Sequence, residues 1–480
     1  MPRLALVAGA LGALGSLGPL VLLAGCGSPG AKHCALAAPA LPDWRVRTDG
    51  QKFRDSLGRV VLLRGVDAGG RSKFAPYVPF DFPSGGFDGA LAAYLDRAAS
   101  WGVNVFRLPF TWAAVEPAQG VDDAQFLAHY DAIVDGAWAR GIRVVIDFHQ
   151  DVYAENFCGD GFPAWTIPDP KPAPHHDCPN WGSEYAGDPA VQAAFDHFWS
   201  ASSTVRPAYN ALWDRLSARY RDKPGVIGFE LINEPNNGTA ALHDWEMNTL
   251  TPFYSAMGNQ LRAGAPKTLL FFDAPGVEAA ISSTNIGLPD GGGWVFAPHY
   301  YQPTAVLLGG DGDPDQVAAG IAGWANYGKT WNIPVFIGEF GAAHDSADTA
   351  TFLNAHWDAF DSMNLSGTEW EYSQAAEGWN SENFGMVAAD GTEYPIVDAI
   401  ARPYARALSG DGAQASYDGG SKTWSLAFTA DGGVSEIALP SRTFAKGADV
   451  QLSSGCIDDT HAGVLLVQAS APVTLKIKPR

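Results

Sequence analysis

Basic residues are scarce in this chain. Its 480 residues include 31 Lys and Arg against 52 Asp and Glu, a formal net charge of −21 at pH 7, and no stretch is polybasic. Nucleic acids and other polyanions are recognised by clustered positive charge, so neither class is expected as a partner. For the same reason, charge alone would not hold this chain on a membrane surface.

Long hydrophobic runs are rare as well, and a pronounced one lies at the amino terminus. Arg3 is the only charge before a run of Leu, Ala, Val and Gly that ends at Gly25 and Cys26. A basic start, an apolar stretch and small residues before a break are typical of a secretory signal. We therefore expect residues 1–25 to be a signal peptide. Pro19 interrupts the run and no charge cluster follows it, which argues against a transmembrane anchor.

Cys26 would be the first residue after cleavage, a placing that resembles the bacterial lipobox, in which the thiol carries lipid. We expect a lipid anchor on Cys26, followed by a Pro- and Ala-rich tether that completes a linker over residues 26–43. The chain would then be an exported lipoprotein held at the cell membrane. The alternative is an ordinary signal with an incidental cysteine, which would make the protein secreted.

Cysteine is sparse, with five residues in the whole chain. Once Cys26 is set aside for lipid, four remain in an oxidising compartment, and four cysteines allow three pairings that sequence does not choose among. We favour Cys158–Cys178, because this bond would make rigid a Pro- and Gly-rich excursion. Cys34–Cys456 would then join the start of the mature chain to its last domain.

Signatures of metals and cofactors are also missing. His175 and His176 stand directly before Cys178, but adjacent histidines lack the separated spacing of a closed zinc site. No Gly-rich dinucleotide fingerprint follows the first predicted strand. The sequence therefore predicts no metal and no cofactor.

Short apolar strands alternate regularly with helical segments from residue 44 to residue 402. A hairpin is expected first, at residues 44–55. Eight β/α repeats then favour a (β/α)₈ TIM barrel with insertions over an open doubly wound sheet. The predicted strands are Val60–Val66, Val103–Leu108, Arg143–Phe148, Val226–Ile232, Thr268–Phe272, Val295–Pro298, Val335–Gly338 and Gly367–Glu371, and the clearest helices are Phe87–Ala99, Phe126–Arg140, Tyr209–Tyr220 and Thr349–Asp361.

Two regions depart from this alternation. Residues 152–190 follow the third strand without strand or helix periodicity, and loops of this length are usually functional or disordered. Their aromatic content favours a structured lid over the barrel, against the alternative of a decorative insertion: Phe157, Phe162, Trp165, Trp181 and Tyr185. Residues 403–480 carry short alternating strands with Gly and Asp turns, which predicts a small antiparallel β-sandwich. Its strands are expected at Thr423–Phe428, Val434–Leu439 and Val464–Ile477.

Two predicted strands deliver a carboxylate at their carboxyl ends. Glu234 follows the fourth strand, and Glu339 follows the seventh. TIM-barrel enzymes build their sites from these ends, so the two acids are expected to face each other across the barrel mouth. Such a pair suits glycoside hydrolysis, in which one carboxyl group protonates the leaving oxygen and the other attacks the anomeric carbon.

Other strand ends carry polar or aromatic groups that the barrel interior does not need for packing. Arg107 and Tyr301 would keep Glu339 ionised, and His299 would lie near Glu234. Asn233 would hydrogen-bond a sugar 2-hydroxyl group, and Trp370 would form the sugar platform. The full set of expected substrate-binding residues is Lys73, Arg107, Asp147, His149, Asn233, His299, Tyr301 and Trp370.

These motifs resemble glycoside hydrolase family 5. The resemblance rests on Asn-Glu-Pro ending at Pro235, His-Tyr-Tyr ending at Tyr301 and Gly-Glu-Phe-Gly ending at Gly341, and it covers the whole barrel. It implies a retaining mechanism, with Glu234 as the acid/base and Glu339 as the nucleophile.

Within that family, Asp-Phe-His-Gln-Asp-Val-Tyr from Asp147 and Glu-Trp-Glu-Tyr-Ser from Glu369 are similar to endoglycoceramidases, which separate an intact glycan from ceramide. Lys73 matches the glycan-contacting lysine of those enzymes, and Asp147 matches their acidic residue at the end of strand three. The loop at residues 67–72 lacks the Asn of typical members, which leaves the glycan series open between glucosyl- and galactosyl-linked lipids. The expected substrate is therefore a glycosphingolipid, acted on by a monomer. The rivals are a glycanase for soluble β-glucan or mannan, and a carbohydrate-binding protein on an inactive barrel.

Overall fold

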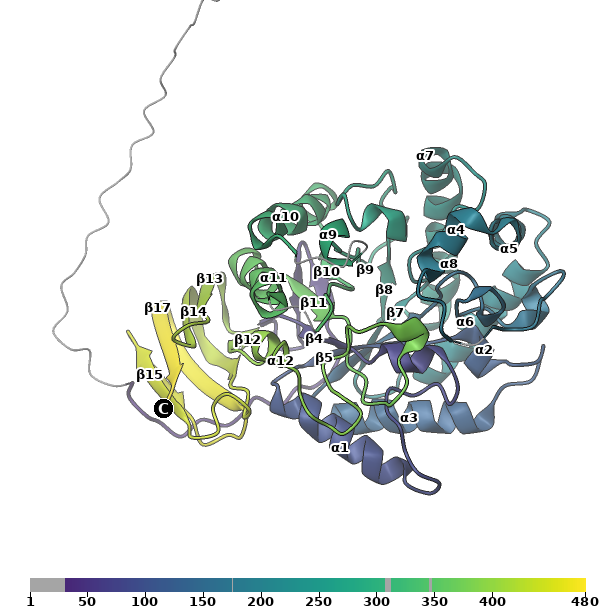
Figure 1. The fold of residues 1–480 in the computed structure, drawn as a ribbon. Helices are drawn as coiled ribbons and strands as arrows, with labels where there is room; N and C mark the ends of the chain where they lie inside the picture. Colours follow the sequence, from purple (N-terminus) through teal and green to yellow (C-terminus); the bar gives the residue numbers. More distant parts are fainter. Residues whose placement is uncertain (1–30, 175, 307–311, 345–347) are drawn as a thin grey trace, which may run out of the picture.

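The computed structural model describes residues 31–174, 176–306, 312–344 and 348–480 (Figure 1). The predicted signal peptide and Cys26 lie outside this range, as does His175. The described chain forms a barrel surrounded by helices and, beside it, an antiparallel sheet built mainly from the last residues (Figure 1). No helix in the described part of the chain has the length and apolar character needed to span a bilayer.

Eight parallel strands form the barrel, in the order β10-β11-β4-β5-β6-β7-β8-β9. The two ends of this path meet, because Phe296 in β9 bridges to Val335 and donates its backbone N–H to Pro334 O at 3.1 Å. The predicted TIM barrel is thus confirmed. Its strands are β4 (Arg64–Asp67), β5 (Val105–Phe110), β6 (Arg143–Phe148), β7 (Val226–Glu230), β8 (Leu269–Phe272), β9 (Trp294–Phe296), β10 (Phe336–Ile337) and β11 (Ser366–Glu369).

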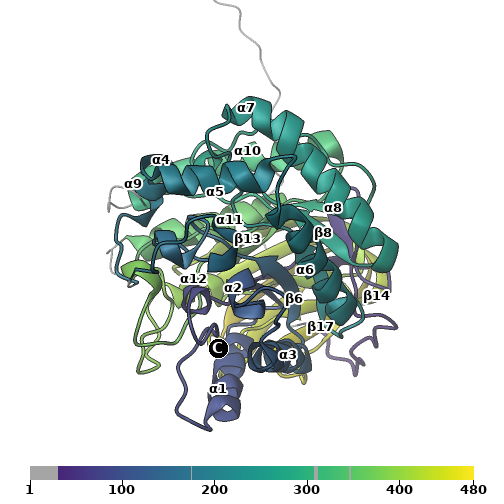
Figure 2. The ribbon, with the colours of Figure 1, turned by 90° about the vertical axis from the view of Figure 1, so that its right-hand side faces the viewer.

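Helices cover the outside of the barrel (Figure 2). Several begin where an acidic side chain caps free backbone N–H groups: Asp123 accepts hydrogen bonds from Gln125 and Phe126 at the start of α3. The four helices expected from periodicity are all present. The α-helices are α1 (Phe87–Ser100), α2 (Trp112–Val115), α3 (Ala124–Ala139), α4 (Glu184–Gly187), α5 (Pro189–Trp199), α6 (Val205–Tyr220), α7 (Leu242–Trp245), α8 (Thr251–Gly264), α9 (Pro303–Val306), α10 (Pro314–Trp331), α11 (Thr349–Met363) and α12 (Val397–Ile400).

The first predicted barrel strand, Val60–Val66, is wrong as a single element. Its start is β3 (Val60–Val61) in the antiparallel sheet, and its end is β4 in the barrel. At the break, Leu63 N–H donates to Ser366 Oγ at 3.0 Å, and Leu62 O accepts from the Asn104 side chain at 2.8 Å. Val61, Leu62, Leu63 and Val66 are buried on both sides of the break, so hydrophobic pattern alone could not separate the two strands.

The antiparallel sheet has nine strands, in the order β1-β2-β3-β12-β14-β17-β15, with β13 paired to β14 and β16 to β17. The predicted antiparallel architecture of the C-terminal region is confirmed, and the amino-terminal hairpin adds its own strands to that sheet. The strands predicted at Thr423–Phe428 and Val434–Leu439 form a single strand, β14. Its pairing has a register shift between Asp431 and Val434. The bounds are β1 (Arg47–Asp49), β2 (Lys52–Arg54), β12 (Tyr404–Leu408), β13 (Gly410–Asp418), β14 (Thr423–Ala438), β15 (Ala448–Leu452), β16 (Cys456–Asp458) and β17 (Val464–Pro479).

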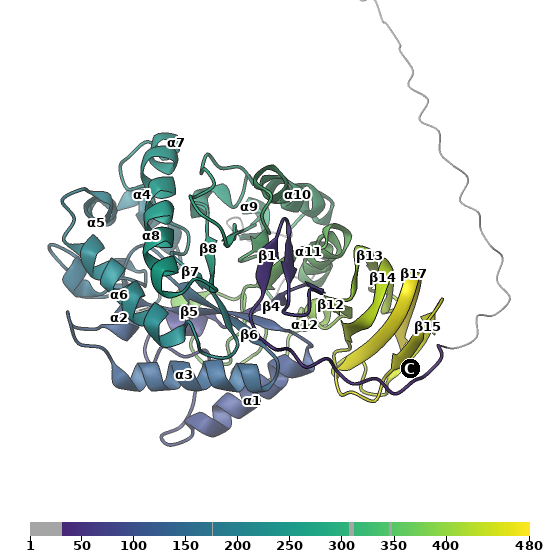
Figure 3. The same ribbon diagram turned by 180° about the vertical axis from the view of Figure 1, so that it is seen from behind.

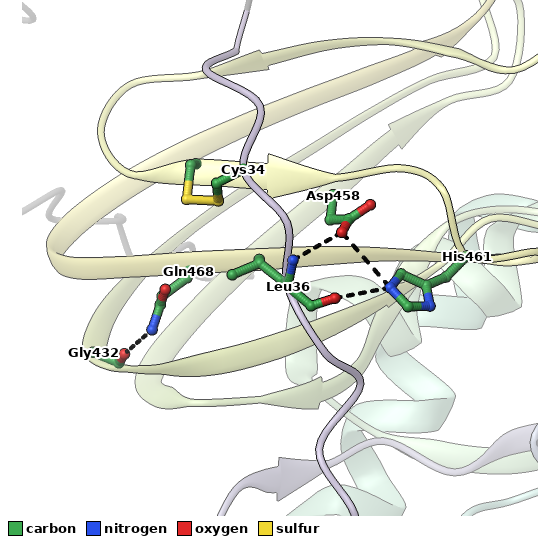
Figure 4. Close-up of a disulfide and its surroundings, with 7 residues drawn as sticks. Cys34, Leu36, Gly432, Asp458, His461 and Gln468 are labelled. Carbon is green, nitrogen blue, oxygen red and sulfur yellow. Dashed lines mark hydrogen bonds and ion pairs between the residues drawn. A yellow bond between two sulfur atoms is a disulfide. The ribbon is translucent and has the colours of Figure 1, made fainter.

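The first described residues run along this C-terminal sheet before reaching β1 (Figure 3). A disulfide joins Cys34 to Cys456, and Leu36 N–H donates to Asp458 Oδ2 at 2.8 Å (Figure 4). His461 Nε2 lies 3.0 Å from Leu36 O. The second disulfide joins Cys158 to Cys178, so both preferred pairings are confirmed.

Candidate active site

Glu234 lies just beyond β7 on a backbone held from two sides. Its φ is 38°, a left-handed conformation that non-glycine residues adopt only when their surroundings enforce it. Its N–H donates to Asp273 Oδ2 at 3.0 Å, and Gln150 Nε2 donates to the carbonyls of Asn233 and Glu234 at 2.9 and 3.0 Å. These contacts fix the direction of the Glu234 side chain.

Glu339 follows β10 and receives a donor on each carboxylate oxygen. Arg107 Nη1 donates to Oε1 at 2.5 Å, and the Tyr301 hydroxyl donates to Oε2 at 3.0 Å. Tyr300 N–H donates to the Glu339 carbonyl at 2.9 Å, which ties the loop after β9 to the loop after β10. The expected contacts of Arg107 and Tyr301 with Glu339 are therefore present.

The two glutamates meet at His299. His299 Nδ1 lies 2.8 Å from Glu234 Oε1 and 3.5 Å from Glu339 Oε2, and its Nε2 lies 3.3 Å from Asp273. One oxygen of Glu234 and one of Glu339 lie within 4.8 Å of each other. Retaining glycosidases hold their carboxyl groups about 5–5.5 Å apart, whereas inverting enzymes need about 6.5–9.5 Å to admit a water. The separation matches a retaining pair.

Charges around Glu339 favour its ionised form. Burial opposes ionisation, but the positive charges of His299 and Arg107 outweigh it and hold the pKa of Glu339 below its ordinary value of 4.5. Burial also opposes a charge on His299, and Asp273 and Glu339 nevertheless raise the pKa of its imidazole well above 6.5. The Glu234 side chain is 17% exposed against 7% for Glu339. Glu234 is thus the more solvent-accessible of the two carboxyl groups.

Arg107 is the buried hub of the site. Its guanidinium donates to both oxygens of Glu230 at 2.8 and 2.9 Å and to Asp67 at 3.1 Å. It also lies 3.1 Å from Asp147 and donates to Asn233 Oδ1 at 2.7 Å. Burial raises the pKa of Asp67 and of Glu230, although Arg107 opposes the rise. One cation therefore positions the strand-end carboxylates around the nucleophile.

Asn233 is buried beside the Glu234 loop. It is 1% exposed, and its amide nitrogen donates to Gln150 O at 3.1 Å while its oxygen accepts from Arg107. Its contacts within the protein hold the Glu234 loop. One amide N–H remains for a substrate hydroxyl.

The side of the site away from Glu234 is aromatic and charged. The His149 ring stacks on Trp370 with centroids 5.3 Å apart, and His149 Nδ1 lies 2.7 Å from Asp147. Lys73 Nζ lies 4.4 Å from the Trp370 ring centroid and 2.6 Å from Asp151 Oδ2. Together with the Arg107 and His299 contacts, these interactions join all ten predicted site residues in one connected cluster.

The excursion after β6 is tied to the loop after β11, as a lid requires. Asn380 Nδ2 donates to Cys158 O at 2.7 Å, and Cys178 N–H donates to Asn380 Oδ1 at 3.2 Å. Trp181 packs edge-on against Trp379, with centroids 4.8 Å apart, and Lys73 lies 4.0 Å from the Trp379 ring. This contact closes the site beyond Trp370.

The five lid aromatics have two different roles. Phe157 and Phe162 are buried, Phe162 stacking on Tyr153, and Trp165 packs against Trp112. These three rings pack against the barrel and away from the site. Burial of their large apolar surface stabilises the attachment of the excursion. Trp181 and Tyr185 reach the site, and the Tyr185 hydroxyl lies 3.5 Å from Asp151.

Sequence reasoning missed several residues of this cluster. Asp273 directly follows β8, so an acid at a strand end was the signal that could have found it. Trp379 and Glu382 come from the irregular loop after β11, which has no periodic pattern. Trp370 Nε1 donates to Glu382 at 3.3 Å, and burial raises the pKa of Glu382 to about 7 although Lys73 opposes the rise.

Comparison with known proteins agrees with this geometry. Residues 80–376 match the family described as cellulase (glycosyl hydrolase family 5), and residues 402–477 match the glycoside hydrolase family 5 C-terminal domain.

Individual proteins also resemble the chain along much of its length. Endoglycoceramidase I of Rhodococcus hoagii (strain 103S) is 26% identical over 479 residues, which cover 92% of this chain and 89% of that protein. The endoglycoceramidase of Cyanea nozakii is 27% identical over 296 residues, 54% of this chain and 57% of that protein. The solved structure of endo-glycoceramidase II from Rhodococcus sp. superposes with a TM-score of 0.74 at 25% identity, covering 89% of this chain and 99% of that one.

Proposed function

The chain belongs to glycosyl hydrolase family 5, and on this premise we propose that it is a retaining endo-glycosidase that cleaves the β-glycosidic bond between the oligosaccharide and the ceramide of glycosphingolipids. Similarity to two endoglycoceramidases supports this substrate class. The retaining mechanism rests on one observation: a carboxylate oxygen of Glu234 and one of Glu339 lie within 4.8 Å of each other.

The reaction follows from the contacts of these two acids. Glu339, ionised between Arg107 and His299, attacks the anomeric carbon and forms a covalent glycosyl intermediate. Glu234 gives its proton to the departing ceramide oxygen, and then takes a proton from the water that releases the glycan. Each of the two displacements inverts the anomeric carbon, so the product keeps the configuration of the substrate.

Exposed aliphatic side chains on the segments that follow β7 and β8 support a lipid leaving group. Among the described residues, six large hydrophobic side chains are exposed, and four of these lie between β7 and α8 or between β8 and β9. The second segment includes Gly276, which packs against the Glu234 carboxyl group. Exposed apolar groups gathered next to a site indicate an interaction with apolar material. The four side chains, called the apolar rim below, are Met247, Val277, Ile281 and Leu288.

The rival activity, hydrolysis of soluble β-glucan or mannan, would need sugar-stacking rings on both sides of the glutamates. Three tryptophan rings, Trp370, Trp379 and Trp181, surround Lys73, and the rings of Tyr301 and Tyr185 also reach the site. The exposed side chains on the Glu234 side are aliphatic. This asymmetry favours a glycan on one side and an alkyl surface on the other.

Export and anchoring complete the proposal. Residues 1–25 act as a signal peptide, and Cys26 carries lipid that holds the monomeric enzyme at the cell membrane. The two disulfides support folding in an oxidising compartment. Mass spectrometry of the mature amino terminus tests the anchor: an unmodified terminus beyond Cys26 would refute it.

The activity is tested by offering the enzyme glucosyl- and galactosyl-linked glycosphingolipids in detergent micelles, and soluble β-glucan and mannan in parallel. We expect free ceramide and an intact oligosaccharide from at least one glycolipid. Release of reducing ends from a soluble polysaccharide, with no ceramide from any glycolipid, would replace the proposal with the rival.

A further inference from the structure

A second cluster of ionisable side chains lies outside the catalytic network. His243 is in α7, Glu246 opens a π-helical turn (Glu246–Leu250), and Glu278 ends a short 3₁₀ turn (Gly276–Glu278) after β8. One nitrogen or oxygen atom from each of the three lies within 4.8 Å of the others. Single π turns inside helices frequently mark functional positions.

Two of these groups are buried carboxyl groups. Glu246 is fully buried, and Glu278 is 2% exposed. In the described part of the chain, neither carboxyl pairs with a Lys or Arg; the ion-pair partner of Glu246 is His243, whose Nδ1 lies 3.4 Å from Glu246 Oε2. Two adjacent buried carboxyls without a cation are costly, because each disfavours the charge of the other.

The two carboxyl groups differ in their hydrogen-bond partners. Glu246 Oε1 accepts from Asn285 N–H at 3.0 Å and from the Thr284 hydroxyl. Glu278 Oε2 is buried and has no hydrogen-bond partner among the described residues. Burial raises the pKa of Glu278 to about 8; Thr284 opposes the rise, and the neighbouring carboxyl group of Glu246 adds to it. A buried acceptor without a donor calls for an explanation, and an ion absent from the coordinates is one.

We propose that His243, Glu246 and Glu278 bind one divalent transition-metal ion such as Zn²⁺. Zinc accepts both imidazole nitrogen and carboxylate oxygen as ligands, whereas Ca²⁺ and Mg²⁺ prefer oxygen ligands alone. The ion would supply the missing positive charge and the partner of Glu278. The His243 side chain is 71% exposed, so an ion enters from solvent and a water completes its coordination. The Asn285 side chain contacts both His243 Nδ1 and Glu246 Oε2 and therefore lies beside the proposed ligands.

The position of the cluster gives the ion a structural role next to the catalytic acid. Glu278 belongs to the turn that begins at Gly276, and Gly276 packs against Glu234. Ala279 O, one residue after Glu278, accepts from Tyr301 N–H at 3.3 Å. An ion that joins Glu278 to α7 therefore holds the loops after β7 and β8 together, and with them the apolar rim. None of the three ligands touches the catalytic glutamates, so the ion takes no part in bond cleavage.

The proposal is tested by metal binding and does not depend on the substrate. Protein without a polyhistidine tag is treated with a chelator, dialysed and titrated with Zn²⁺ by calorimetry, with Mn²⁺ and Ca²⁺ in parallel, and its thermal unfolding is followed with and without Zn²⁺. His243→Ala removes an exposed ligand and leaves the core intact. Asp244→Asn, an exposed acid on the same helix, is the matched control.

We expect one Zn²⁺ equivalent that the Asp244→Asn variant keeps and that His243→Ala weakens at least about 100-fold, since losing a ligand costs at least as much as losing an orienting neighbour. Zn²⁺ should also raise the unfolding temperature of the control and not that of His243→Ala. Glu278→Gln should lose the same equivalent. If His243→Ala and Asp244→Asn bind Zn²⁺ alike, or neither binds, the cluster is instead a carboxyl pair that shares a proton, and the proposal is overturned.

Discussion

Gly276 packs so closely against Glu234 that a methyl group at position 276 would come within 2.4 Å of Glu234 Oε2 and 2.7 Å of its carboxyl carbon. The acid/base therefore has no room to move toward the loop after β8. Its opposite side is held by His299 Nδ1 at 2.8 Å. The absence of a side chain at Gly276 thus sets where Glu234 points.

The first prediction concerns this contact. Gly276→Ala should push the Glu234 carboxyl away from His299 and lower kcat by about 10–100-fold, since a displacement of about 1 Å can cost 10²-fold. Thermal unfolding should change little, because the Glu234 carboxyl end can shift. Gly292→Ala is the control, since a methyl group there meets nothing within 4 Å. Equal kcat in both variants would show that Gly276 does not position the acid.

The catalytic assignment predicts loss of turnover on neutralising either acid. Glu339→Gln and Glu234→Gln should each reduce kcat by at least about 10²–10⁴-fold while the fold persists. With a substrate that has a good leaving group, azide should rescue both variants. It should give the product with inverted configuration in Glu339→Gln and the retained one in Glu234→Gln. The opposite outcome would exchange the two roles.

The pH dependence follows from the lowered pKa of Glu339. Glu339 must be ionised to attack, and His299 and Arg107 hold its pKa below 4.5 against burial, so the acid limb of kcat/KM should lie below pH 4.5. The same shift contributes stability that is present above the unfolded pKa and lost as the pH falls through the folded one. His299→Asn removes a positive charge and should move the acid limb upward. An unmoved limb would mean that His299 does not set this pKa.

The apolar rim predicts a loss that depends on how the substrate is presented. Val277→Ser with Ile281→Ser should lower kcat/KM on glycolipid micelles by about tenfold or more, because about 1.5–3 kcal/mol is lost for each large apolar side chain that no longer enters the lipid surface. Turnover of a soluble aryl glycoside should stay unchanged. The matched control replaces Leu57 and Val121, exposed apolar residues outside the apolar rim. Parallel losses on both substrates would remove the lipid-contact role.

The disulfide between Cys34 and Cys456 predicts a stability effect without a catalytic one. The bond spans 422 residues, and replacing both cysteines with Ser should lower the free energy of unfolding by about 2–4 kcal/mol. Denaturant unfolding measures this loss. Turnover should be kept, because both cysteines contact the C-terminal sheet. The Cys158→Ser, Cys178→Ser variant should differ by raising KM, since that bond shapes the lid. A fall in kcat on removing the first disulfide would contradict this separation.

Much of this protein could be predicted from residue pattern. The strand Arg143–Phe148 is recognisable as a short apolar run that is buried at every position, and the helix Thr349–Asp361 as a pattern of buried residues at helical spacing. Glu234 and Glu339 were identifiable for a related reason: a charged group at the end of an apolar strand needs a function or a partner. Where a strand ends is decided by the residues around that end, so the local sequence pattern predicts which side chains follow each strand.

Contacts between distant segments were decided by the tertiary structure alone. The pattern that predicted Val60–Val66 as one strand could not show that β3 and β4 enter different sheets. No local signal pairs Arg107 with Glu230, or brings Asn380 between Cys158 and Cys178. Such contacts depend on how segments more than a hundred residues apart pack, and packing is chosen by the shape and charge of the whole interior. The sequence determined which residues could do the chemistry, and closure of the barrel decided which of them meet.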